Sequence, residues 1–173
     1  MPAGPAVAAA GPFGDTPAMS TTLPDLAEVL GRVLQRVPRE QQPLLVALAE
    51  RLAAERYRGW AREDPEHAAG LLECAAREEE IARRVEALHP THESTTRELM
   101  ARNPDLLEIN RSLFVALSLA EQLALQARGE RLGAATWRAF ARADSDPERR
   151  DAFLACALLE EESAAFLESV AKR

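Results

Sequence analysis

Hydrophobic residues recur at every third or fourth position along most of this 173-residue chain, the spacing of amphipathic α-helices. The helices that this pattern predicts span residues 25–37, 43–62, 65–88, 105–143 and 147–173. Between residues 91 and 104 the chain is polar, and we expect a connection that carries one short helix. Short turns within the pairs of long helices and a long connection between the pairs predict an all-α four-helix bundle with one crossover.

The chain contains an internal repeat that supports this pairing. Each copy contains a glutamate, an aromatic-Arg-x-aromatic segment, an Asp-Pro-Glu turn and a Cys-containing helix with three successive glutamates. The offset between the copies is 80 residues before the Asp-Pro turn and 82 after it, so the second turn is two residues longer. The paired landmarks are Glu50 and Glu130, Tyr57 and Trp137, Asp64 and Asp146, Cys74 and Cys156, and Glu78 and Glu160. Such a repeat predicts two similar helical hairpins related by a pseudo-twofold axis.

Four glutamates occupy equivalent positions in the repeat: Glu50, Glu78, Glu130 and Glu160. Each lies in the middle of an otherwise apolar helix face. Because an isolated buried carboxylate is costly, such groups are normally protonated, paired with a base or bound to a metal. The adjacent Glu79, Glu80, Glu161 and Glu162 fall outside these faces, and we expect them to be solvated.

Four inward glutamates from four helices are similar to the ligands of di-iron carboxylate bundles, in which two helices also carry a Glu-x-x-His motif. Together with the aromatic residues seven positions after Glu50 and Glu130, this makes residues 43–170 resemble the rubrerythrin-like branch of the ferritin-like superfamily. The resemblance implies a ferritin-like four-helix bundle of two pseudo-twofold-related hairpins with an extra N-terminal helix. It also implies oxygen or peroxide as the small substrate and a metal held by Glu50, Glu78, Glu130 and Glu160.

Both histidines of the family pattern are replaced, by Ile81 and Ser163. Oxygen-only ligation favours hard cations, or weakly held iron, so the expected cofactor of this all-carboxylate centre is iron or manganese. The alternative is a site without a cofactor, whose carboxylates are protonated, solvated or paired with arginine. Two functions therefore stay open: a metal-binding protein that handles oxygen or peroxide, and a non-catalytic ferritin-like scaffold or interaction module. Whether the chain is an enzyme is undecided at this point.

Two cysteines, Cys74 and Cys156, lie one turn before Glu78 and Glu160 on the same faces. They could act as soft ligands or as a redox pair, but buried cysteines more often pack as small hydrophobic residues, and we expect core packing. Aromatic residues at helical spacing are also expected in the core: Tyr57, Trp60, Trp137 and Phe140.

Charge and composition narrow the partners. The net charge of −7 and the pI of about 5.1, without a cluster of Lys and Arg, indicate no nucleic-acid partner. No apolar run is long enough for a membrane span. Two cysteines do not form a disulfide framework, and we expect a cytoplasmic protein.

The expected domain organisation is a tail followed by one helical bundle. Residues 1–22 are rich in Ala, Pro and Gly and are predicted to be a disordered tail that could dock a protein partner. Residues 23–173 form the bundle, with hairpin one at 43–88, a crossover at 89–104 and hairpin two at 105–172. The family resemblance further implies a homodimer.

Overall fold

The computed structural model describes residues 23–171, and this part of the chain is all-α, without a strand. The predicted tail, residues 1–22, lies outside the described residues. The helices are α1 (Leu26–Leu34), the short 3-10 helix η1 (Arg39–Gln41), α2 (Gln42–Glu63), α3 (Ala68–Ala87), α4 (His92–Arg102), α5 (Leu106–Ser112), α6 (Leu119–Ala143) and α7 (Pro147–Val170). No helix within residues 23–171 is long and apolar enough to cross a membrane.

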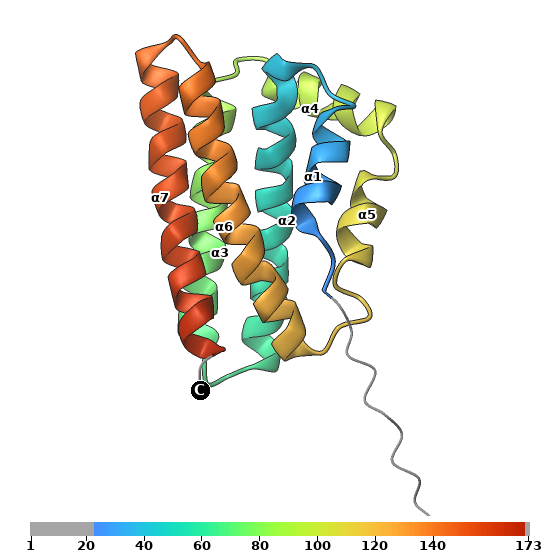
Figure 1. Cartoon of the computed structure of the whole chain (residues 1–173), viewed down its shortest axis with the longest axis vertical. Coiled ribbons are helices and arrows are strands. Elements are labelled where there is room, and N and C mark those ends of the chain that lie inside the picture. The colour runs from blue at the N-terminus through green and yellow to red at the C-terminus, as the bar shows by residue number, and fades with distance from the viewer. Residues whose placement is uncertain (1–22, 172–173) are drawn as a thin grey trace, which may run out of the picture.

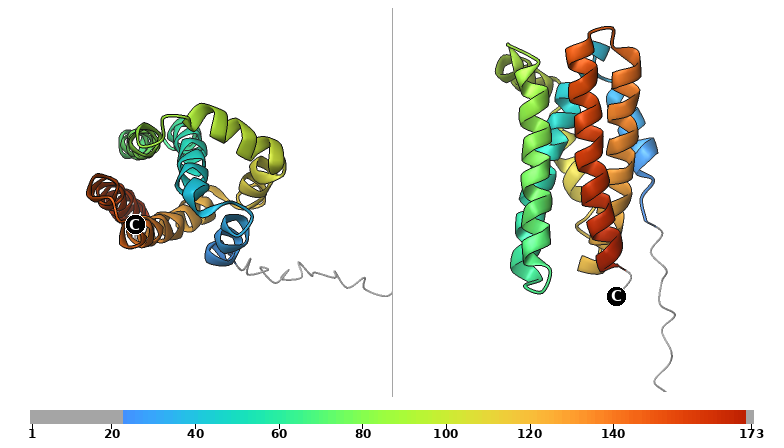
Figure 2. Two further views of the ribbon diagram at one scale, coloured as in Figure 1. Left: turned by 90° about the horizontal axis from the view of Figure 1, so that it is seen from above. Right: turned by 90° about the vertical axis from the view of Figure 1, so that its left-hand side faces the viewer.

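Four long helices lie side by side and carry most of the tertiary contacts (Figure 1). α2 packs along α3, and α6 packs along α7, so the chain forms two hairpins. The hairpins meet mainly where α3 contacts α7. Seen from above, α1 and α5 lie on the far side of α2 and α6 from α3 and α7 (Figure 2).

The core consists of two apolar clusters, one toward each end of the long helices. The first contains Leu44, Ile81, Trp137 and Phe153, and the second contains Tyr57, Leu71, Leu125 and Leu167. In each long helix the glutamate singled out above lies between residues of one cluster and residues of the other. The carboxylates therefore form a polar layer across an otherwise apolar interior.

The buried faces of the long helices agree with the predicted stripes. In α3 the buried residues are Leu71, Cys74, Ala75, Glu78, Ile81, Ala82 and Val85. In α7 they are Phe153, Cys156, Ala157, Glu160, Ser163, Ala164 and Leu167. Both sets match the helical spacing, because the 3.6-residue period fixes which side chains share a face.

The predicted start of the helix at Pro65 is wrong, because α3 begins at Ala68. Asp64 is the C-cap residue of α2, and its backbone N–H donates to the carbonyl of Trp60 at 2.8 Å. Its carboxylate then bridges the turn, with Oδ2 at 2.8 Å from Nδ1 of His67. In the second repeat the expectation is correct, because Asp146 caps α7 and Pro147 is its first residue.

The single helix predicted over residues 105–143 is also wrong, because the chain is non-helical between α5 and α6. Ser118 and Glu121 form a capping box at the start of α6, with the Ser118 backbone N–H donating to Glu121 Oε2 at 2.8 Å. A capping box satisfies the free N–H groups of a first helical turn, so it favours a new helix start at this point. Hairpin two is therefore made of α6 and α7, and α5 is free to pack elsewhere.

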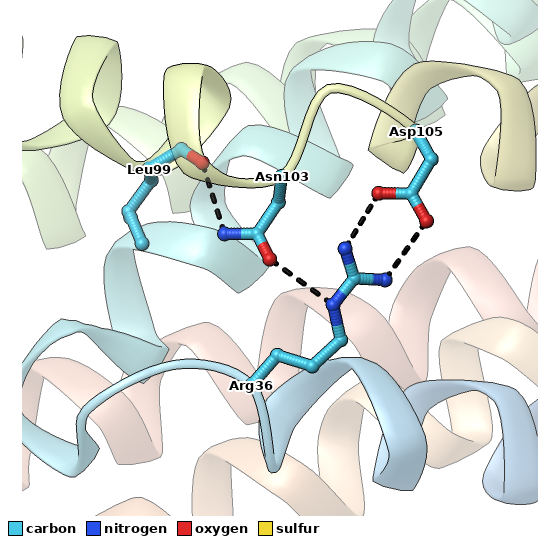
Figure 3. A network of polar contacts seen from close by, with 4 residues as sticks. All are labelled: Arg36, Leu99, Asn103 and Asp105. Carbon is cyan, nitrogen blue, oxygen red and sulfur yellow. Dashed lines mark hydrogen bonds and ion pairs between the residues drawn. The ribbon is translucent and has the colours of Figure 1, made fainter.

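The end of α1 is tied to the crossover by Arg36 (Figure 3). Its Nε donates to Asn103 Oδ1 at 3.0 Å, and its Nη1 donates to Asp105 Oδ2 at 3.0 Å. Asn103 in turn donates to the carbonyl of Leu99 at 3.0 Å. The helix predicted over 25–37 ends at Leu34 instead, and this network positions its last residues against α4 and α5.

Candidate metal centre: a buried layer of four glutamates

All four glutamates of the repeat are buried, as their positions in the apolar stripes predict. The exposed fractions are 8% for Glu50, 0% for Glu78, 1% for Glu130 and 1% for Glu160. They come from α2, α3, α6 and α7 respectively. Each of the four long helices thus contributes one carboxylate to the same layer of the interior.

Neighbouring side chains donate hydrogen bonds to three of these carboxylates. Glu130 Oε1 accepts from the Tyr57 hydroxyl at 2.7 Å and from Gln126 Nε2 at 2.6 Å. Glu160 Oε1 accepts from the indole N–H of Trp137 at 2.8 Å. The remaining donor is Ser163, whose hydroxyl lies 3.1 Å from Glu78 Oε1. These bonds fix the orientation of the carboxylates before any ligand binds.

Three of the four glutamates come close enough to share one ion. Glu50, Glu78 and Glu160 each offer an oxygen within 4.8 Å of the others. Glu130 is not part of this group, although its charge is the second cause of the raised pKa of Glu50. The second oxygens of Glu78 and Glu130 are buried without a hydrogen-bond partner. An unpaired buried oxygen is costly, so both atoms lack a proton donor or a cation.

Burial makes the ionised form of the central carboxylates unfavourable. It raises the pKa of Glu50 to about 8, with a further increase from the charge of Glu130. Burial and neighbouring carboxylates also raise the pKa of Glu78 and of Glu160 well above the usual range. Without a bound cation, these shifts favour the protonated form of the three groups, because like charges in a dry site repel one another.

One half-buried arginine approaches the layer but does not form an ion pair with it. Arg56 donates from Nη1 to Asn110 at 2.6 Å and from Nη2 to Gln126 at 3.1 Å, and its guanidinium lies 4.3 Å from the centre of the Phe114 ring. Among the ion pairs formed within residues 23–171, none involves the four glutamates. The alternative in which arginine neutralises the cluster through a direct ion pair is therefore not what the structure contains.

Two polar residues of this region were missed by sequence reasoning, namely Arg56 and Gln126. Gln126 stands four residues before Glu130, a spacing that places both on one helix face, so the signal was present. Arg56 is next to Tyr57, and its role depends on α5, which supplies Asn110. No pattern in the sequence indicated where α5 would pack.

A glycine makes room for one of the carboxylates. A Cβ atom added to Gly133 would lie 2.5 Å from Glu160 Oε1. Real Cβ atoms essentially never come so close to another atom. In the first repeat the corresponding position is Ala53, so the two halves of the layer are not packed identically.

The two positions of the missing histidines are buried but chemically different. Ile81 is part of an apolar cluster, whereas Ser163 donates to Glu78. No histidine or cysteine joins the group of candidate metal ligands found in the described range. Cys74 and Cys156 are buried free thiols, and burial raises their pKa to about 11 and about 12, which fits core packing rather than thiolate ligation.

The outer glutamates point away from the layer, as the stripes predict. Their ion-pair partners are Arg58 for Glu79, Arg83 and Arg84 for Glu80, Arg138 for Glu161, and Arg77 for Glu162. This arrangement rules out the alternative register in which one of them would replace Glu78 or Glu160.

Comparison of the chain with protein-family models, with curated proteins and with solved structures finds no match. Any statement about function therefore depends on the geometry and chemistry of the glutamate layer itself.

Proposed function

We propose that the glutamate layer is an all-carboxylate cation site in a ferritin-like, rubrerythrin-like four-helix bundle. The observation that carries this proposal is the meeting of Glu50, Glu78 and Glu160 oxygens within 4.8 Å, together with the unpartnered buried oxygens of Glu78 and Glu130. A divalent cation held by Glu50, Glu78 and Glu160 would neutralise several carboxylates at once and give the unpartnered oxygen of Glu78 a partner.

The donor set fits a hard cation. Carboxylate oxygens suit Mn²⁺, Mg²⁺ and Ca²⁺, and they hold Fe²⁺ less tightly than sites that include imidazole. A bound iron or manganese would supply redox chemistry toward oxygen or peroxide, the substrates that the family resemblance implies. The chain's own contribution is orientation: Tyr57 and Gln126 hold Glu130, Trp137 holds Glu160, and Ser163 holds Glu78.

A second function, a structural scaffold or interaction module without a cofactor, is favoured by a different observation. The raised pKa values of Glu50, Glu78 and Glu160 allow these groups to stay protonated. Protonated carboxyls can donate hydrogen bonds to one another, so these three groups can be neutral without a metal. In that case the glutamates specify the packing of the four helices and do no chemistry.

Elemental analysis by mass spectrometry separates the two functions. The protein is purified without chelator or affinity metal, and a second sample is loaded anaerobically with Mn²⁺ or Fe²⁺. We expect near-stoichiometric metal in the wild type and its loss in Glu78→Gln/Glu160→Gln. The matched control is Glu79→Gln/Glu161→Gln, which changes the neighbouring outer glutamates and should keep the metal. Metal-free wild type after anaerobic loading would eliminate the cation site.

Thermal unfolding gives an independent readout of the same question. A cation that binds only the folded state raises the melting temperature, and above Kd the stabilisation grows with the logarithm of the cation concentration. We expect added Mn²⁺ to stabilise the wild type and to leave Glu78→Gln/Glu160→Gln unchanged. The scaffold function predicts that Mn²⁺ leaves the melting temperature unchanged. It also predicts that replacing the buried glutamates leaves the stability unchanged or raises it.

A further inference from the structure

A cavity of about 180 Å³ lies beside the glutamate layer, between helices α1, α2, α5 and α6. Most of its wall is apolar, and each of these helices contributes. Residues that line it include Leu30, Val46, Ala49, Ile109, Leu113 and Leu132. α1 and α5, which form part of its wall, lie beside α2 on the side of the bundle away from α7 (Figure 1).

The cavity also reaches the carboxylates. Glu50, Glu130 and Glu160 are part of its wall, as are Gln126 and Arg56. Arg56 donates from both Nη atoms to amide oxygens and its guanidinium lies against Phe114, whereas its Nε is buried without a hydrogen-bond partner. A molecule in the cavity would therefore contact mainly hydrocarbon and, at the layer, carboxyl groups and the Arg56 guanidinium.

We propose that this cavity binds a small, neutral, predominantly apolar organic molecule, of the size of an alkylbenzene or a short alkane, directly beside the carboxylates. The size follows from the volume, since an apolar cavity of about 150 Å³ accommodates benzene. Neutrality follows from the wall: a charged ligand of either sign would lose its hydration against leucine, valine and isoleucine side chains. The α1 helix, which has no fully buried residue, closes one side of the cavity.

This proposal goes beyond the cation site and does not depend on it. Only the cavity and its apolar wall are required for binding. The experiment is therefore done on the full chain in the presence of a chelator, so failure of metal binding and failure of apolar binding give separate results.

The test is a titration with toluene, followed by methyl chemical shifts in nuclear magnetic resonance spectra. We expect saturable shifts at Leu30, Val46 and Ile109, and a weakening of toluene affinity by at least tenfold in Ala49→Phe, whose ring would occupy the cavity. The matched control is Ala155→Phe, at a half-buried alanine of α7 that does not line the cavity, and it should keep the wild-type affinity.

A second variant and two further probes make the test decisive. Leu30→Trp fills the cavity from α1, which is a peripheral helix. Its effect on toluene affinity can therefore be measured even if circular dichroism shows that Ala49→Phe is unfolded. Absence of saturable shifts in the wild type, or unchanged affinity in Leu30→Trp, would overturn the proposal. Benzylamine and benzoate should each bind at least tenfold more weakly than toluene; tighter binding of either would show that the ligand is charged, contrary to the proposal.

Discussion

The hairpins α2–α3 and α6–α7 carry the same carboxylates at equivalent positions but surround them with different donors. Tyr57 donates across the bundle to Glu130, whereas its counterpart Trp137 donates to Glu160 within its own hairpin. Ser163 donates a hydrogen bond to Glu78, but its counterpart Ile81 has no side-chain donor for Glu160. Trp137 thus supplies the bond that Ile81 cannot. A sequence repeat can therefore keep the ligand positions while the hydrogen bonds around them differ.

The largest effect of this asymmetry is expected at Trp137. Trp137→Phe removes the donor to Glu160 and leaves a void in a fully buried site. We expect a loss of about 3 kcal/mol in the free energy of unfolding, from the cavity and the unpaired carboxylate together. Chemical denaturation measures it. A loss below that of Tyr57→Phe would contradict the unequal roles of the two aromatic residues.

Gly133 gives the next largest effect. Gly133→Ala forces a Cβ atom against Glu160, and we expect a loss of about 2 kcal/mol, typical of overpacking in a core. Gly129→Ala is the matched control one turn earlier in α6, because its Cβ would lie at an ordinary 3.6 Å from Leu26. There the removal of a helical glycine should stabilise the protein by about 0.5–1 kcal/mol. Effects of the same sign in both variants would refute the steric argument.

The metal-free protein should become less stable as pH rises through the neutral range. Glu50 has a pKa near 8 in the folded protein against an ordinary value of 4.5, so the native state holds one more proton than the unfolded chain between these values. The free energy of unfolding then falls by about 1.4 kcal/mol per pH unit for each such proton. Urea denaturation at several pH values measures the slope.

Two variants test the origin of this pH dependence: Glu50→Gln in the buried layer and Glu80→Gln, the control, outside it. Glu50→Gln should reduce the slope by the share of one proton, because an amide does not titrate, while Glu78 and Glu160 keep their raised pKa values. Glu80→Gln should leave it unchanged, since Arg83 and Arg84 hold the pKa of Glu80 at about 2, below the window concerned. An unaltered slope in Glu50→Gln would mean that other groups cause the dependence.

The smallest effect is expected for Tyr57→Phe, the counterpart of the first variant. Glu130 loses one hydrogen bond but keeps the bond from Gln126, and the ring volume is nearly unchanged. We expect a loss of about 1 kcal/mol, the usual net value of one buried hydrogen bond. The double variant Tyr57→Phe/Gln126→Leu should lose more than the sum of the single changes, because the remaining donor is then removed as well.

Much of the helical pattern was predictable because local rules decide it. The burial of Glu78 and Glu160 follows from a 3.6-residue period that no distant contact needs to establish. The break before α6 was signalled by Ser118 and Glu121, whose spacing of three residues is that of a capping box. The cavity was not predictable, because it depends on where α1 and α5 pack, and no sequence period encodes that placement.

The pair of Gly133 and Glu160 restricts the order in which this sequence can change. While Glu160 keeps its present conformation, any side chain at position 133 meets its carboxylate, which then has to shift. Once Glu160 is shortened, the space is free and position 133 accepts alanine. Of the two routes to a chain that lacks both residues, only the one that alters Glu160 first avoids a strained intermediate. Substitution of Gly133 is therefore disfavoured for as long as position 160 carries a glutamate.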